Sequence, residues 1–392
     1  MLLSGCQLPF LLLWESENIY SATKYIQNYK DNWQYNTLTD KEKSYYGQLY
    51  TAVMDTKDTE SIATYTEDGT QEKQMMGVQV YLPRATLTQE QMTRLFEAFY
   101  RDNPQFFFLA REYRMGGHNN LKDEPSYDTI LLQYTMNSAK RKTSVQAFTA
   151  KADQLLSDLT QTEDDYLTEL YLHDKIAELC LYDEQAAAED TEGTSNAYTA
   201  YGALVEGKAV CEGYAKAFQY LLHRVDIPAT VVVGKSLSNT EAHMWNLVTI
   251  NGENYFVDPT WNDIQNRVQH TYFNLTTEML APTHTIDKGQ AAVLPCTATK
   301  DNYFYRNRTY IDTYSRDTIA KRFAARINAG DTIVELKFEN SKYSNGLLFL
   351  KNWNLVEQKT APYLTDGNTL WGYELFSNPD QCVLTLCKME DS

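Results

Sequence analysis

Three residues in the middle of the chain have the types and the order of a thiol-based acyl-transfer centre. Cys211 lies in the segment GKAVCEG, His243 begins HMWNLVTI, and Asp258 ends the segment YFVD. A thiolate can attack a carbonyl carbon, an imidazole can move the proton, and a carboxylate can orient the imidazole. The sequence therefore predicts a catalytic triad of Cys211, His243 and Asp258.

Cys211 is expected at the first position of a helix. Apolar residues recur after it at helical spacing, among them Tyr214, Phe218 and Leu221, and Pro228 marks the end of that helix. At a helix N-terminus the macrodipole and the unbonded backbone N–H groups favour a thiolate over a thiol. The same N–H groups can hold the oxyanion that forms when the thiolate attacks a carbonyl.

His243 and Asp258 are expected on the two strands of one hairpin. Asn251 and Gly252 separate two apolar runs, and this pair is typical of a two-residue type I′ turn, in which both central residues have positive φ. The turn fixes the register and places Trp245 opposite Asp258. His243 is then the diagonal neighbour of Asp258, with the two Cα atoms about 7 Å apart, close enough for an imidazole N–H to reach a carboxylate. A shift of one residue would put the two side chains on opposite faces.

The blocks GKAVCEGYAKAF, AHMWNLV and YFVDPTW resemble the segments around the Cys, His and Asp of the transglutaminase-like superfamily in its bacterial form. The resemblance extends upstream through His173-Asp174 and Leu181-Tyr182-Asp183, and covers about 167 to 261. It implies a papain-like α+β core in which Cys211 forms a thioester, His243 moves the proton and Asp258 orients the imidazole. Tyr201 is a candidate for the side-chain oxyanion donor of this family.

The acyl acceptor decides which reaction such a centre performs. Water as acceptor gives a cysteine protease or amidase that acts on peptide or side-chain amide bonds, which is the function we expect. An amine as acceptor gives a protein-glutamine transamidase, and a groove that only binds peptide or cell-wall material gives a non-catalytic module. A thiol acetyltransferase is disfavoured because no coenzyme A feature is recognisable. Nothing resembles the β-sandwich domains and calcium sites of animal transglutaminases, or the paired Cys-x-x-Cys zinc motifs of a peptide N-glycanase.

The elements around these blocks predict three parts. Residues 1–140 are expected to form an N-terminal α+β region, 141–295 the transglutaminase-like core, and 296–392 a small α+β or β-rich domain. The expected helices are 88–102 with Thr88 and Gln91 as a capping box, 145–159, 163–180 with Thr162 as cap, and one capped by Asp317. The expected strands are 106–114, 129–134, 332–338, 346–350, 370–376 and 383–387.

Composition excludes several classes of protein. The 392 residues include 52 acidic and 35 basic side chains, a formal charge of −17 that opposes a phosphate backbone, so no nucleic-acid partner is expected. No apolar run approaches the roughly 20 residues of a membrane span. Six cysteines in so long a chain do not make a disulfide framework. Cys382 and Cys387 are expected on opposite faces of a strand, roughly 16 Å apart and unable to bridge, and Cys180 and Cys296 are expected to be buried thiols.

No metal and no cofactor is predicted. The remaining histidines show no ligand spacing with one another or with cysteine; they are His118, His173, His223, His270 and His284.

The N-terminus contains a lipobox-like segment, Leu3-Ser4-Gly5-Cys6. Only five residues precede Cys6, whereas a secretory signal needs a charged region and an apolar stretch of roughly 7 to 15 residues. Lipidation of Cys6, with membrane attachment at the cell surface, is one hypothesis, and a chance match is the other. The expected partner is a protein or peptide substrate outside the cell, with cell-wall peptide as one candidate.

Overall fold

A computed structural model of the chain describes residues 29–67, 71–82, 87–117, 127–159, 164–189, 195–264, 267–288, 290, 293–365, 367–370 and 372–389. Contacts between Cα atoms cluster in two compact units. The first comprises residues 1–232, 244–246 and 290–293, and the second comprises 233–243, 247–289 and 294–392. The division into three parts that the sequence suggests stays a prediction.

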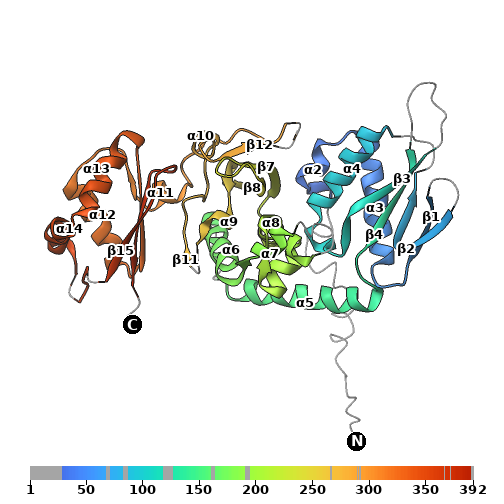
Figure 1. The fold of residues 1–392 in the computed structure, drawn as a ribbon, viewed down its shortest axis with the longest axis horizontal. Helices are drawn as coiled ribbons and strands as arrows, with labels where there is room; N and C mark the ends of the chain where they lie inside the picture. Colours follow the sequence, from blue (N-terminus) through green and yellow to red (C-terminus); the bar gives the residue numbers. More distant parts are fainter. Residues whose placement is uncertain are drawn as a thin grey trace, which may run out of the picture. The chain divides into compact units, whose positions relative to one another are not determined.

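The first unit begins with an α+β layer (Figure 1). Its antiparallel sheet has the order β1-β2-β4-β3, with β1 Ile62–Glu67, β2 Gln71–Tyr81, β4 Tyr127–Tyr134 and β3 Leu109–Gly117. The helices of this part are α2 (Trp33–Thr37), α3 (Asp40–Thr56) and α4 (Gln89–Asp102). Helix α3 packs on β2, and helix α4 packs on β3. The predicted capping box of Thr88 and Gln91 is confirmed at the start of α4.

The rest of the first unit is mainly helical. Its elements are α5 (Ser138–Ser157), α6 (Asp165–Leu179), β5 (Leu181–Tyr182), α7 (Glu184–Ala188), a 3-10 turn (Asn196–Tyr198), a π-helical turn (Gly202–Glu206), β6 (Lys208–Ala209) and α8 (Cys211–Arg224). Helix α6 packs against α8. The cap of α6 is Asp164, whose side chain accepts from the backbone N–H of Tyr166; Thr162, the expected cap, lies outside the described residues.

A four-stranded antiparallel sheet of order β12-β7-β8-β9 carries the hairpin of the predicted site. Its strands are β7 (Ala229–Ser236), β8 (Ala242–Ile250), β9 (Glu253–Val257) and β12 (His284–Ile286). Short elements follow β9, namely α9 (Pro259–Asn262), β10 (Asp263–Ile264), β11 (Arg267–Val268) and α10 (Thr277–Leu280). Mixed helices and strands thus agree with the predicted α+β class.

The C-terminal part of the second unit is a sheet of order β13-β14-β16-β15 packed with helices (Figure 1). The elements are α11 (Tyr303–Arg306), β13 (Tyr310–Ile311), α12 (Arg316–Asn328), β14 (Ile333–Phe338), α13 (Asn340–Lys351), α14 (Trp353–Thr360), β15 (Tyr373–Asn378) and β16 (Val383–Lys388). Phe323 of α12, Leu336 of β14 and Leu384 of β16 are buried together in its core. This part is α+β rather than β-rich.

Two sequence predictions fail in this part of the chain. Residues 346–350, expected as a strand, lie in helix α13, and a Cβ on Gly346 would be 2.3 Å from the ring of Phe338. A five-residue apolar run fits a buried helix face as well as a strand, so periodicity cannot separate the two. The cap of α12 is Ser315, whose hydroxyl accepts from the N–H of Thr318, and Asp317 lies inside the first turn.

Among the described residues, Cys180, Cys211, Cys296, Cys382 and Cys387 are all outside disulfides, and Cys180 and Cys296 are buried as expected. No helix in the described ranges is long and apolar enough to cross a bilayer. The lipobox-like segment with Cys6, and also His118, lie outside the described residues.

Candidate active site

Cys211 is the first residue of helix α8, as predicted. Val210 occupies the N-cap position, and its side chain cannot accept a hydrogen bond from the first turn. Serine, threonine, asparagine or aspartate at that position would bond to one of the first backbone N–H groups of the helix. An apolar cap leaves these groups to solvent or to an anion, and the partly exposed thiol of Cys211 lies beside them.

The motif upstream of Cys211 holds the start of α8 in place. Strands β5 and β6 pair in parallel, with Leu181 opposite Lys208, so the segment Leu181-Tyr182-Asp183 runs beside the residues that lead into Cys211. Asp183 and Lys208 form an ion pair of 2.8 Å, and the hydroxyl of Tyr214 in α8 donates to the carbonyl of Cys180 at 2.7 Å. The segment Leu181-Tyr182-Asp183 and the segment around Cys211 therefore contact each other directly.

Gly213 allows a close approach in the first turn of α8. A Cβ at this position would lie 2.5 Å from the carbonyl oxygen of Ala197 and 2.7 Å from Cβ of Ala209. Both distances are shorter than the contacts of real side chains, so any larger residue would push the turn that carries Cys211 away from its neighbours.

Glu212, next to the predicted nucleophile, is a buried carboxylate between two cations. It contacts Nζ of Lys216 at 2.8 Å and Nη1 of Arg111 at 3.3 Å, and the ammonium of Lys216 lies 3.6 Å from the ring centroid of Tyr100. Burial by itself would raise the pKa of Glu212, but the charges of Lys216 and Arg111 outweigh it and hold this pKa below its usual value. The first turn of α8 is thereby tied to β3, which carries Arg111.

We expect Glu212→Gln to destabilise the first unit by about 3 to 5 kcal/mol, because it leaves the ammonium of Lys216 buried without its counter-charge. The stabilisation from the carboxylate is present above the ordinary carboxyl pKa of an unfolded chain, and it is lost as the pH falls through the lowered folded-state value. Urea unfolding at pH 7 and at pH 4 measures both effects. The variant and the wild type should differ less at the lower pH.

The double variant Glu212→Gln, Lys216→Met is the matched control, because it removes both buried charges together. It should recover most of the lost stability. A single variant as stable as the wild type at pH 7 would contradict the role given to this ion pair.

The β8–β9 hairpin has the predicted turn. Asn251 and Gly252 have φ values of 54° and 82°, and Thr249 and Asn254, directly opposite in the predicted register, join their side chains at 2.8 Å. Nε2 of His243 lies 2.6 Å from Oδ2 of Asp258. The predicted pairing of these two side chains is confirmed.

Asp258 accepts hydrogen bonds on both of its oxygens. Oδ1 accepts from the backbone N–H groups of Thr260 and Trp261 at 3.0 and 3.1 Å, and Oδ2 is contacted by His243 and by a second histidine, His284, at 3.1 Å. Burial by itself would raise the pKa of Asp258, but the two imidazoles outweigh it and hold the pKa well below its usual range. Asp258 is therefore ionised at neutral pH.

The ionised carboxylate fixes the tautomer of the predicted base. An ionised carboxylate only accepts hydrogen bonds, so the proton of the 2.6 Å contact belongs to Nε2 of His243. In the neutral imidazole, Nδ1 then carries the lone pair, and this is the nitrogen that can take a proton from a thiol.

His284 is the site residue that the sequence did not reveal. It is the first residue of β12 and pairs with Ser236 of β7. This strand pairing brings it to Asp258, which lies 26 residues earlier in the sequence. Its ring centroid lies 4.4 Å from that of Trp261 and 5.6 Å from that of Tyr272. No local spacing signals this contact, since strand pairing alone creates it.

His243, Asp258 and His284 are also of the types that bind metal ions, and the three ligand atoms lie close together. The distance of 2.6 Å between nitrogen and oxygen fits a shared proton. Ligand atoms of a tetrahedral zinc site, at their usual bond lengths, stand about 3.3 Å apart. The geometry therefore favours hydrogen bonds among His243, Asp258 and His284 over a zinc site.

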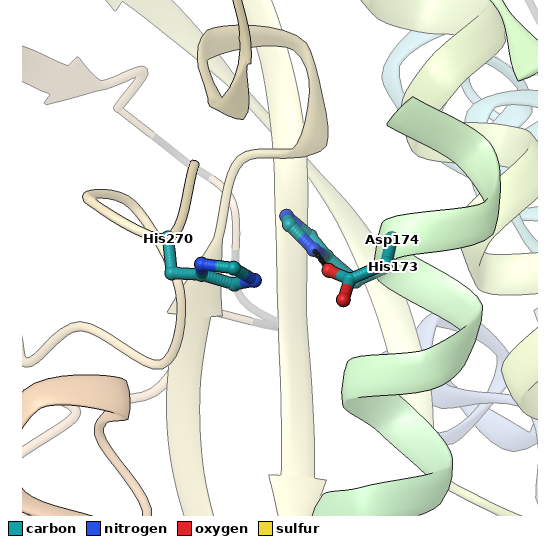
Figure 2. Close-up of side chains that lie close together, drawn as sticks. All are labelled: His173, Asp174 and His270. Carbon is teal, nitrogen blue, oxygen red and sulfur yellow. Dashed lines mark hydrogen bonds and ion pairs between the residues drawn. The ribbon is translucent and has the colours of Figure 1, made fainter. Parts of the chain in front are cut away.

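Two other histidines, His173 and His270 (Figure 2), each have a carboxylate as a hydrogen-bond partner. His173 is buried on α6, and its Nδ1 lies 2.8 Å from Oδ1 of Asp174 on the same helix. His270, in the second unit, stacks on Tyr303 with ring centroids 3.9 Å apart and contacts Glu335 at 2.7 Å.

A buried amide joins β8 to α8 within the first unit. Asn246, three residues after His243 on β8, is buried and donates from Nδ2 to the carbonyl of Ala215, four residues after Cys211 on α8, at 2.9 Å. Cys211 belongs to the first unit, and His243 and Asp258 belong to the second. Tyr201, the candidate oxyanion donor, is buried with its ring stacked on Phe107 at 4.8 Å.

A family model matches the part of the chain that contains Cys211, His243 and Asp258. Residues 153–259 match the model of the Transglutaminase-like superfamily. No protein of the curated set matches this chain. A solved structure of a TGase is 17% identical, with 52% of this chain and 55% of that chain covered and a TM-score of 0.26.

Two further solved structures are similar at this level. A candidate cysteine protease from Cytophaga hutchinsonii is 13% identical, with 38% of this chain and 61% of that chain covered and a TM-score of 0.24. A candidate protease from Parabacteroides distasonis is 12% identical, with 51% and 36% covered and a TM-score of 0.20. This chain thus spans less than two thirds of each of these structures. The match to the family model assigns a transglutaminase-like core to residues 153–259, and members of that superfamily are typically cysteine-dependent enzymes.

Proposed function

We propose that the protein is a cysteine hydrolase that cleaves peptide or side-chain amide bonds through Cys211, His243 and Asp258. The observation that carries this proposal is the buried hydrogen bond of 2.6 Å between His243 and Asp258, which prepares an imidazole to act as a base. The start of α8 adds a thiol beside backbone N–H groups that no side chain caps. The superfamily match supports the same chemistry.

The reaction has two halves. The thiolate of Cys211 attacks the amide carbon, and the carbonyl electron pair moves to oxygen, where N–H groups of the first α8 turn hold it. The tetrahedral intermediate collapses, the C–N bond breaks, and the imidazolium of His243 gives its proton to the leaving amine. Water then attacks the thioester while His243 takes its proton, which releases the acid and restores the thiol.

The acyl acceptor separates the proposal from its nearest alternative, a transglutaminase. The test incubates the protein with a glutamine-containing peptide, with and without a labelled primary amine. Release of ammonia or peptide fragments in the mixture without amine supports a hydrolase, whereas transamidation also releases ammonia when the amine is present. Incorporation of the amine in preference to hydrolysis would instead support a transamidase.

A peptide or cell-wall binding module is the alternative from another class. Such modules typically lose a member of the triad, whereas this chain keeps all three residues. Two separate samples decide between them: one is labelled with an activity-based thiol probe, and the other, unlabelled, is profiled on a peptide library. Labelling of Cys211 together with turnover supports the enzyme, and retained peptide affinity with no labelling and no turnover would support the module.

A further inference from the structure

A chain of buried hydrogen bonds continues from Asp258 into the C-terminal sheet. Nε2 of His284 contacts Oδ2 of Asp258 at 3.1 Å, and Nδ1 of His284 contacts the hydroxyl of Thr283 at 2.8 Å. Nε2 of Gln381, in the turn between β15 and β16, donates to the same hydroxyl at 3.3 Å and to the carbonyl of Met279 at 3.0 Å. All these residues belong to the second unit.

The whole series of hydrogen bonds from Asp258 to Gln381 is shielded from water. Asp258, His284, Thr283 and Gln381 are each at most 5% exposed. A buried polar group that loses its partner costs about 1 to 3 kcal/mol, so each link constrains the next. Nζ of Lys337 holds the far end, with contacts to the backbone and side-chain oxygens of Gln381 at 2.9 and 3.2 Å.

The hydroxyl of Thr283 suits His284 in either protonation state. With neutral His284, the hydroxyl donates to Nδ1 and accepts from Gln381. With cationic His284, it accepts from both Nδ1 and Gln381 and donates to the carbonyl of Leu280, which lies 3.2 Å away. In both states Nε2–H of His284 points to Asp258, so the contact to the carboxylate persists.

Ring packing fixes the orientation of His284. Its ring lies against Trp261 and Tyr272, and its centroid is 5.3 Å from that of His243. The titratable groups that face it are Asp258, His243 and Tyr272. Among the described groups, the imidazole of His284 contacts the predicted site through the carboxylate of Asp258.

We propose that His284 is a positioning residue for the predicted base, and that Thr283 and Gln381 hold it in place. The inference rests on the proposed function. Two donors on one carboxylate oxygen fix the direction in which Asp258 accepts from His243, and they spread its negative charge over two imidazoles. Through Gln381, the C-terminal sheet becomes part of the catalytic apparatus.

Two substitutions at one position separate the donor from the packing. His284→Phe keeps an aromatic ring against Trp261 and Tyr272 but cannot donate to Asp258. His284→Gln keeps an N–H near the position of Nε2. We expect kcat to fall by about 10- to 100-fold in His284→Phe, which is the loss typical of a misplaced catalytic group, with KM little changed, and to be largely restored in His284→Gln.

The pH profile distinguishes positioning from a general loss of structure. Without His284, the charge of Asp258 falls on His243 alone and stabilises its imidazolium. The basic limb of the kcat profile should therefore move to higher pH in His284→Phe, by about 0.5 to 1 unit. A loosened fold would lower kcat at every pH and leave the limb where it is, and that result would overturn the inference, as would unchanged kcat.

Nitrogen NMR of the ¹⁵N-histidine-labelled full chain keeps the inference testable apart from activity. His243 should be protonated at Nε2 in the wild type, and in His284→Phe the pH at which its ring nitrogens titrate should rise, because Asp258 then interacts with His243 alone. If the wild type turns over no substrate, the proposed function fails, and these signals still decide whether His284 positions His243. Unchanged His243 signals in His284→Phe would overturn the positioning role.

Discussion

Replacement of Cys211 by alanine is expected to lower turnover of any substrate by at least about 10⁴-fold, because no other group can form the thioester. The side chain is partly exposed at the helix start, so its loss leaves no large cavity. The unfolding midpoint should remain that of the wild type. Turnover is measured on a peptide library at saturating protein, with thermal unfolding as the check on folding.

Cys382→Ser is the matched control for this experiment. Cys382 is the other partly exposed cysteine of the described residues, and it lies in the turn between β15 and β16. Its substitution should leave turnover unchanged. Turnover by Cys211→Ala within a few-fold of the wild type would remove Cys211 from the mechanism and favour the binding module.

Asp258→Asn is expected to reduce kcat by about 10³- to 10⁴-fold while the fold persists. The asparagine oxygen can still accept from the N–H groups of Thr260 and Trp261, which places its NH₂ group toward His243 and His284. An NH₂ group donates and therefore forces the opposite tautomer on His243, with the proton on Nδ1. That nitrogen then has no lone pair for the thiol proton.

Glu253→Gln gives the control for charge alone, because it removes an exposed carboxylate from the same strand, β9. Its kcat should equal that of the wild type. The tautomer argument also predicts that Asp258→Asn loses kcat at every pH between 5 and 9. Recovery of activity at the higher pH values would show that Asp258 acts only through its charge.

The sequence was sufficient for the hairpin because its determinants are local. A two-residue turn at Asn251 and Gly252 sets the register, and the register sets which side chains of β8 and β9 meet. The helix start at Cys211 is similarly local, since apolar spacing and Pro228 define it. For these two elements, predictions from short-range rules agree with the structure.

Contacts made by distant segments could not be predicted. His284 reaches Asp258 only because β12 pairs with β7, and Arg111 reaches Glu212 across 101 positions of the chain. No rule based on spacing in the sequence predicts either contact. Residues 346–350 show a second limit, since an apolar run takes its secondary structure from packing, here against Phe338.

The central claim is that Cys211, His243 and Asp258 act together as a catalytic triad. The alkylation rate of Cys211 tests this claim most directly. Iodoacetamide labelling at pH 6, followed by mass spectrometry, reports Cys211 and Cys382 in the same sample, and burial raises the pKa of the Cys382 thiol, which makes it a slow internal reference. We predict that Cys211 reacts at least about tenfold faster than Cys382 in the wild type, and that His243→Ala removes most of this difference. Equal Cys211 rates in the wild type and in His243→Ala would contradict the account.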